Sequence, residues 1–199
     1  DGDAHRNPTL LIDGEDHLFV FYGAHNHPTK VLRSRNPLDI ASWESRAEIP
    51  ETSYPQPWPL QPGELFLTYR GGGAREGTPW RFRHSTDGGH SWSEGAELAF
   101  FPECAIYGVS IAESGSYPRK VHFVWSRLGG GTPDEIEGKH LWARRYNVYY
   151  ACSDDGGHTW KRSDGSAYGL PIDEESAEKV YDCGQRGVWL KDIQLDPQG

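Results

Sequence analysis

The sequence contains no methionine and only three cysteines among its 199 residues. Cys104, Cys152 and Cys183 show no metal-ligand spacing and allow at most one internal disulfide, so we expect buried free thiols. No apolar run approaches the length of a membrane span, and no signal peptide is visible. Because the chain begins at Asp1 and lacks methionine, we expect a processed protein or a fragment of a longer one.

Basic charge and helical periodicity are also scarce. The formal net charge of -9 argues against nucleic acid or an anionic membrane as a general partner. No stretch of about 12 residues carries a convincing helical apolar period. By contrast, 8 Trp, 10 Tyr and 7 Phe exclude a solvated coil, and 24 Gly with 14 Pro favour short strands joined by tight turns. The composition therefore predicts an all-β globular protein.

Two octets of nearly the same sequence, Ser85–Trp92 and Ser153–Trp160, follow the pattern SxDGGxxW. The aspartate of such an octet can accept hydrogen bonds from nearby backbone amides, and the paired glycines permit positive φ. The tryptophan can then pack the turn against the fold. We interpret both octets as structural turns rather than catalytic groups.

Around these octets the chain falls into repeated units that close at Trp43, Trp92 and Trp160. Each unit has an entry strand, an alternating apolar strand, a strand ending in serine and a turn, which predicts blades of four antiparallel strands. Within a single domain over 1–199, we place these blades at 5–50, 51–100 and 101–165. An insertion occupies 128–145, and residues 185–199 begin the next unit. So few blades cannot close a ring, and we therefore predict that the chain is part of a larger, seven-bladed β-propeller.

Blade topology sorts the polar residues before any chemistry is invoked. In an antiparallel blade, the start of strand one, the end of strand two and the start of strand three share one rim. The octet turns lie on the opposite rim. The residues that this rule gathers on the first rim are His5, His25, His27, Tyr69, Arg70, Arg81 and Arg83.

This combination of side chains suits β-elimination on a uronic-acid polysaccharide. An arginine would neutralise the uronate carboxylate, one residue would remove the C5 proton and another would protonate the departing glycosidic oxygen. No cofactor is required, although His5, His25 and His27 could alternatively ligate a metal, and a structural metal ion remains open. The insertion rises on the same rim, and we expect Arg127 and Trp142 to bind the glycan there, unless this segment is only a solvated loop.

The octet resembles the Asp-box of bacterial neuraminidase repeat (BNR) proteins. The first blade resembles the branch of that superfamily that includes the seven-bladed ulvan lyases, through His5–Pro8, Phe21–His25 and Ser34–Trp43. The resemblance implies a polysaccharide lyase with a cleft lined by two histidines, a tyrosine and an arginine. The matching positions are His5, His25, Tyr69 and Arg83, with Arg70 and Arg81 competing for the arginine role.

Two other functions stay open. Sialidases share the Asp-box, but no Arg-Ile-Pro motif precedes the first blade and no Tyr-Glu nucleophile pair can be placed. A non-catalytic carbohydrate-binding propeller is the second, because a fold alone implies no activity. Under the lyase hypothesis we expect a secreted or periplasmic protein that acts on an anionic polysaccharide. We expect no nucleic-acid or membrane partner, and the missing blades would come from the same parent chain.

Overall fold

The computed structural model describes residues 7–72, 77–102, 104–113, 119–129, 144–184 and 186–196. Their regular elements are β-strands, which confirms the all-β class. The chain divides into two compact units, with 1–72, 81–96 and 114–119 in the first and 73–80, 97–113 and 120–199 in the second. Among the described residues, no helix has the length and apolar character needed to cross a membrane.

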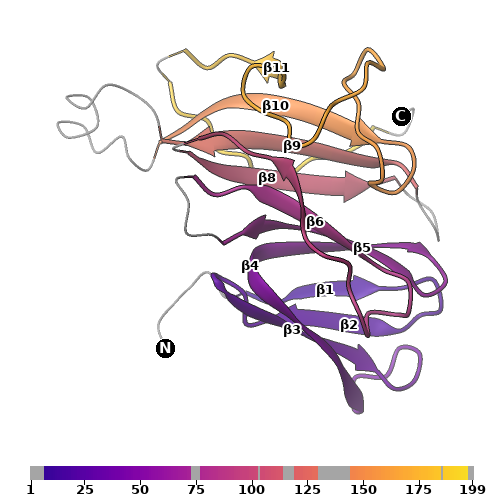
Figure 1. The fold of residues 1–199 in the computed structure, drawn as a ribbon. Coiled ribbons are helices and arrows are strands. Elements are labelled where there is room, and N and C mark those ends of the chain that lie inside the picture. Colours follow the sequence, from indigo (N-terminus) through magenta and orange to yellow (C-terminus); the bar gives the residue numbers. More distant parts are fainter. Residues whose placement is uncertain are drawn as a thin grey trace. The chain divides into compact units, whose positions relative to one another are not determined.

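The first unit is built from antiparallel strands that pair in chain order (Figure 1). These strands are β1 (Thr9–Ile12), β2 (Leu18–Tyr22), β3 (His27–Ser34), β4 (Trp43–Gln61), β5 (Glu64–Gly71) and β6 (Trp80–Ser85). The sheet order continues to β7 (Ala96–Ala99). Consecutive antiparallel pairing is the connectivity of propeller blades.

Strand β4 serves two groups of strands in succession. Its first half pairs with β3 from Trp43 to Thr52, and its second half pairs with β5 from Thr52 to Gln61. The first half therefore has one edge outside the ladder with β3, and the second half has one edge outside the ladder with β5. Proline lacks an N–H donor and is tolerated on such edges, which explains how β4 accommodates four prolines. They are Pro50, Pro55, Pro57 and Pro59.

Alternating apolar residues of these strands build the core of the first unit. The half-buried Trp92 packs against this core and meets Phe21 edge-on, with ring centroids 6.2 Å apart. The octet tryptophan therefore fastens its turn to the strands, as the sequence predicted. The buried members of the core are Leu11, Phe19, Phe21, Val31, Ile49, Leu65, Leu67 and Tyr69.

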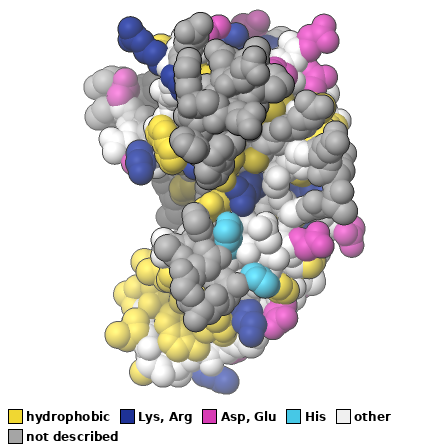
Figure 2. Space-filling view, turned by 90° about the vertical axis from the view of Figure 1, so that its left-hand side faces the viewer, with side chains coloured by type: hydrophobic (Ala, Val, Ile, Leu, Met, Phe, Trp, Pro, Cys, Tyr) yellow, Lys and Arg dark blue, Asp and Glu magenta, His cyan; other side chains and the backbone are white. Residues whose placement is uncertain are grey.

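The hairpin of β1 and β2 also presents an apolar outer surface. Leu10 and Ile40 are 72% and 78% exposed, and with Ile12 and Trp43 they line a cavity of about 400 Å³. Hydrophobic side chains gather at the surface in this part of the molecule (Figure 2). Apolar residues on both faces are typical of strands in a layered fold, where sheets pack face to face.

The second unit contains a four-stranded antiparallel sheet in the order β11-β10-β9-β8. Its strands are β8 (Ala105–Ala112), β9 (Val121–Leu128), β10 (Arg145–Ser153) and β11 (Glu178–Tyr181). Aromatic residues fill its core: Trp125 stacks on Phe123 at 5.0 Å and on Tyr149 at 5.6 Å between ring centroids. This sheet has the antiparallel, four-stranded form expected of a propeller blade.

Each unit contains one octet turn, and in both turns the aspartate accepts hydrogen bonds from the same octet positions. Asp155 accepts from the backbone N–H and the hydroxyl of Thr159 at 2.9 and 2.6 Å, and from the Ser153 hydroxyl at 2.7 Å. Burial acts to raise the pKa of Asp155, but the bonds from Thr159 and Ser153 outweigh it and lower the pKa to about 2. The aspartate is thus a fixed acceptor that holds the turn closed.

In the first unit, the Asp87 carboxylate accepts from Ser91 and Ser85 in the same way. The Ser91 hydroxyl is the main cause that lowers the pKa of Asp87 to about 2. The N–H of Gly88 donates to the Gly63 carbonyl at 2.8 Å, just before β5 begins. The other end of this eight-residue strand lies roughly 24 Å away. The octet turn and the end of β5 therefore occupy opposite rims, as predicted.

Candidate functional site

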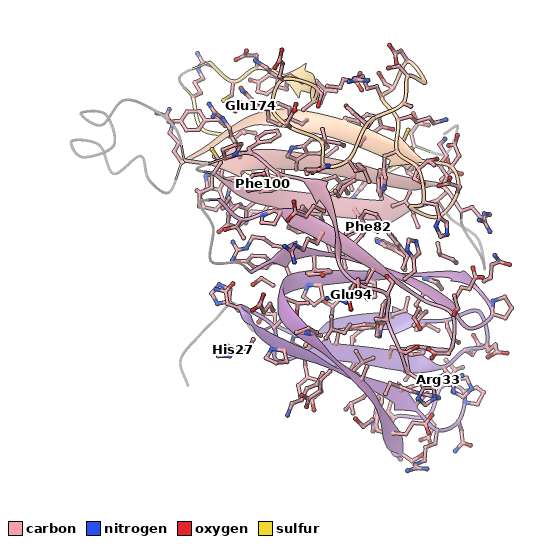
Figure 3. The ribbon with its side chains drawn as sticks, in the orientation of Figure 1. His27, Arg33, Phe82, Glu94, Phe100 and Glu174 are labelled. Atoms are coloured by element: carbon pink, nitrogen blue, oxygen red, sulfur yellow. The ribbon has the colours of Figure 1, made fainter. Side chains whose placement is uncertain are left out.

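The candidate site lies where β2, β4 and β5 meet at one rim of the first unit. β2 ends at Tyr22 and leads towards His27, which begins β3 (Figure 3). β5 ends at Gly71. Thr52, in the middle of β4, pairs with His27 on one side and with Gly71 on the other. The end of β2 and the end of β5 are thereby brought together across β4.

The backbone at this rim is unusual because left-handed conformations fall on residues other than glycine. Such residues rarely have positive φ, and clusters of them are typical of functional sites. The N–H groups of His25 and Asn26 donate to the Thr52 carbonyl at 2.9 and 3.1 Å, which anchors their turn to β4. The positive-φ residues here are His25 (96°), Asn26 (59°), Glu51 (50°) and Tyr54 (54°).

Side chains from the three converging segments are in contact. The Tyr54 ring lies beside the His25 imidazole, with ring centroids 6.0 Å apart and planes at 56°. The Arg70 guanidinium carbon lies 4.8 Å from the centre of the same Tyr54 ring, a cation–π contact. Arg70 is 7% exposed, whereas His25 and Tyr54 are half-buried. The rim therefore holds a histidine, a tyrosine and an arginine, here named the His25–Tyr54–Arg70 group.

Arg81, at the start of β6, lies close to the end of β5. A Cβ atom added to Gly71 would stand 2.7 Å from Arg81 Cδ, so a larger residue at this position would displace the arginine side chain. Gly71 itself pairs with Thr52, which also anchors the His25 turn. The half-buried Arg81 therefore belongs to the same rim.

Tyr69 and Arg83 form a separate pair. Arg83 Nε donates to the Tyr69 hydroxyl oxygen at 2.9 Å, and Arg83 Nη1 donates to the Ser93 carbonyl at 2.5 Å. Tyr69 is 1% exposed within the core. Arg83 lines a cavity of about 260 Å³ together with Ser91 and Trp92 of the octet turn. The pair is thus directed into the core and towards the octet.

In the second unit, Arg127 pairs with an acidic partner. Its Nη1 lies 3.2 Å from Glu174 Oε2, and the Tyr149 hydroxyl donates to Glu174 Oε1 at 3.0 Å (Figure 3 labels Glu174). Burial acts to lower the pKa of Arg127, but Glu174, Cys104 and Tyr149 together outweigh it and raise the pKa. For the Tyr149 hydroxyl, burial has the opposite effect and raises the pKa to about 12. Arg127 therefore stays positively charged and forms an ion pair with Glu174.

Two predicted site residues, His5 and Trp142, lie outside the described residues, as does most of the insertion 128–145. Within the described ranges, no group of three or more His, Cys, Asp or Glu side chains is arranged to hold a metal ion. Sequence reasoning missed Tyr54. Its signal is a tyrosine directly before Pro55 inside an otherwise extended strand, a position that favours a bulge.

The antiparallel groups of strands with Asp-box turns define the class of the protein: a β-propeller fold. More narrowly, the chain belongs to the BNR repeat-containing family, whose profile matches residues 1–195. Both expectations from the sequence, the fold class and the family resemblance, are confirmed.

The chain is similar to ulvan lyases in sequence. It is 25% identical over 202 residues to an ulvan lyase of Alteromonas sp. (strain LOR), an alignment that covers 88% of this chain and 40% of the relative. It is 24% identical over 230 residues to an ulvan lyase of Pseudoalteromonas sp. (strain PLSV), covering 99% of this chain and 45% of the relative. The chain thus spans less than half the length of these curated relatives.

Solved structures agree on the fold. A polysaccharide lyase PL25 ulvan lyase bound to -[GlcA(1-4)Rha3S]- superposes with a TM-score of 0.72 at 21% identity, covering 88% of this chain and 44% of that one. The polysaccharide lyase Uly1 gives a TM-score of 0.64 at 17% identity, covering 91% and 47%. At these identities the superpositions support the propeller fold.

Proposed function

We propose that this chain carries part of the active site of a polysaccharide lyase that cleaves an anionic, uronic-acid-containing glycan by β-elimination. The observation that carries the proposal is the convergence of His25, Tyr54, Arg70 and Arg81 on one rim. Similarity to ulvan lyases over most of the chain supports ulvan as the substrate class.

The reaction needs a cation at the uronate carboxylate. Pairing the carboxylate with an arginine stabilises the negative charge that develops when the C5 proton leaves. We assign this role to Arg81, because it is half-buried and lies beside the end of β5 at the rim, while Arg83 is directed towards Tyr69 and the octet. Arg70, which is 7% exposed and covered by Tyr54, would support the site from beneath.

The reaction also needs a base for the C5 proton and an acid for the glycosidic oxygen. Histidine suits both tasks near neutral pH. We assign proton transfer to His25 together with His5, and we keep Tyr69 as the alternative acid that the family resemblance implies. We prefer His25 to Tyr69 because His25 is only half-buried. Tyr69 is 1% exposed, and its hydroxyl oxygen accepts a hydrogen bond from Arg83.

Arg127 and Trp142 remain proposed sugar-contacting residues. We also expect a secreted or periplasmic protein, since a polysaccharide cannot enter a cell, and an elimination that needs no cofactor. Nucleic acid and membranes are not expected as partners of a protein with a net charge of -9.

A lyase assay tests the proposal directly. Incubation with ulvan and other uronic-acid polymers should produce ultraviolet absorbance from the new C4–C5 double bond. Release of free sialic acid without this absorbance would support a sialidase instead. Glycan binding with neither product would support a non-catalytic propeller, and either result would overturn the lyase assignment.

A further inference from the structure

Tyr54 occupies the centre of the rim, although the family resemblance assigns it no role. Its ring contacts two charged or titratable side chains, His25 of the β2–β3 turn at 6.0 Å and Arg70 of β5 at 4.8 Å. It lies 29 positions after His25 and 16 before Arg70 in the sequence. The ring therefore joins parts of the site that are distant along the chain.

The backbone turns Tyr54 into this position through an irregularity of β4. Ser53 pairs with Arg70 and Gln56 with Thr68, so the register shifts between them and leaves a bulge at Tyr54 and Pro55. A bulge bends its strand and re-aims a side chain. Tyr54 also has a φ of 54°, which a non-glycine residue adopts only where the surroundings hold it.

Surrounding hydrogen bonds supply that support. The Thr9 hydroxyl donates to the Pro55 carbonyl at 2.9 Å, which fixes the far side of the bulge. Pro55 has no N–H group, so the bulge leaves no donor there without an acceptor. On the near side, Ser53 Oγ accepts from the Asn26 N–H at 2.9 Å, which links the bulge to the His25 turn.

Resting on the proposed lyase function, we propose that Tyr54 is a positioning residue whose aromatic ring fixes the His25 imidazole and the Arg70 guanidinium relative to each other. The ring carries this role, because its face contacts Arg70 and its side lies against His25. Cation–π and ring contacts do not need the phenol hydroxyl. Phenylalanine should therefore replace Tyr54, whereas residues without a ring should not.

Three variants of the full chain separate the ring from the backbone. Tyr54→Phe should keep kcat on ulvan within a few fold. Tyr54→Leu and Tyr54→Gly should lower kcat by about 100-fold with little change in KM, because small misplacements of catalytic groups reduce rates by that factor. Tyr54→Gly accepts the left-handed backbone without strain, so its loss of activity would not come from misfolding.

Asp16→Gly is the matched control, because Asp16 also has a positive φ of 62° but lies in the turn between β1 and β2. Its kcat should equal that of the unmodified chain, with thermal unfolding recorded for every variant. If Tyr54→Leu and Tyr54→Gly keep full kcat, or if Tyr54→Phe loses as much as they do, the role of the ring is wrong. A chain that lacks lyase activity altogether overturns the proposed function instead.

A spectroscopic measurement tests the positioning role without substrate. In the free protein, the NMR signals of the His25 ring should be similar in the unmodified chain and in Tyr54→Phe. They should move and broaden in Tyr54→Gly and Tyr54→Leu as the imidazole gains freedom. Unchanged His25 signals in all variants would overturn the inference, whatever the outcome of the activity assay.

Discussion

The octet turn Ser85–Trp92 carries left-handed backbone on glycines, whereas the rim that holds His25 carries it on residues other than glycine as well. At the octet rim, Gly88 and Gly89 have φ values of 66° and 83°. At the opposite rim, His25 and Tyr54 have φ values of 96° and 54°. Glycine adopts this conformation without steric conflict, whereas other residues are destabilised by about 1–2 kcal/mol. Left-handed backbone is therefore free of strain in the octet turn. At His25 and Tyr54, the surrounding structure must hold it in place.

The second unit repeats the octet turn, and among its described residues Asn147 in β10 is the non-glycine residue with positive φ, at 55°. Gly156 and Gly157 again have positive φ, and Asp155 has the same acceptor role as Asp87. The repeated part of the sequence thus marks what holds a blade together. His25 and Tyr54 are not part of the repeat, and their constrained backbone marks where we expect the chemistry.

Removal of a histidine from each rim should separate the two roles most strongly. His25→Ala should lower kcat on ulvan by at least about 100-fold, the usual contribution of a proton-transfer group. His90→Ala at the octet rim, where His90 is exposed, should leave kcat unchanged. Rates followed by the absorbance of unsaturated uronate would contradict the assignment if both variants kept equal activity.

The arginines offer a narrower comparison. Arg81→Ala should reduce kcat/KM by about 10- to 100-fold, since a charge-assisted hydrogen bond contributes about 1.5–3 kcal/mol. Arg83→Ala should instead lower the melting temperature, because it removes the donor to the Tyr69 hydroxyl oxygen within the core. A loss of kcat/KM without loss of stability in Arg83→Ala would restore the role that the family resemblance implies.

At the octet rim, Asp155→Ala should act on stability and not on catalysis. We expect a loss of about 2 kcal/mol in the free energy of unfolding, measured with urea at neutral pH, because three hydrogen bonds to a charged but partly solvated carboxylate disappear. Equal stability of the variant and the unmodified chain at neutral pH would refute the structural role of the turn.

The same variant has a pH signature. The pKa of Asp155 is about 2 in the folded state, below its ordinary 3.8, so the ionised carboxylate stabilises the fold above pH 3.8. That contribution should disappear as the pH falls from 3.8 through about 2. The stability difference between Asp155→Ala and the unmodified chain should therefore narrow over that range.

The smallest effect is expected from the octet glycine that faces open space. A Cβ added to Gly88 would meet no atom within 4 Å. Gly88→Ala should therefore lower the free energy of unfolding only through the strain of left-handed backbone, by about 1 kcal/mol. Gly88→Asn should lose less, because asparagine tolerates left-handed backbone better than alanine does. Equal denaturation midpoints for the alanine variant and the unmodified chain would show that this turn relaxes freely.

Local patterns explain why the fold was predictable. The octets specify their own turns, since Asp87 and Asp155 accept hydrogen bonds from residues within four positions. The strand alternation that precedes each octet likewise depends on neighbouring residues. The rule that puts octet turns and the end of β5 on opposite rims follows from antiparallel pairing alone.

The candidate site was only partly predictable, because side-chain direction depends on strand phase. Tyr69 and Arg70 are neighbours in β5, so their side chains point to opposite faces. The sequence placed both at the rim, but only Arg70 joins His25, while Tyr69 enters the core. Tyr54 was missed because its position depends on a bulge that pairing with β5 creates.

The continuous strand β4 also governs how the first unit unfolds. Its 19 residues pair with β3 up to Thr52 and with β5 from Thr52 onwards, with a bulge at Tyr54 and Pro55. Thr52 belongs to both ladders. If the pairing with β3 or with β5 opens, Thr52 loses one partner, and the pairing on its other side is weakened. We expect amide hydrogen exchange along β4 to report a single cooperative opening rather than independent openings of the two groups of strands. Disorder that starts at β1 would then reach His25 and Arg70 together.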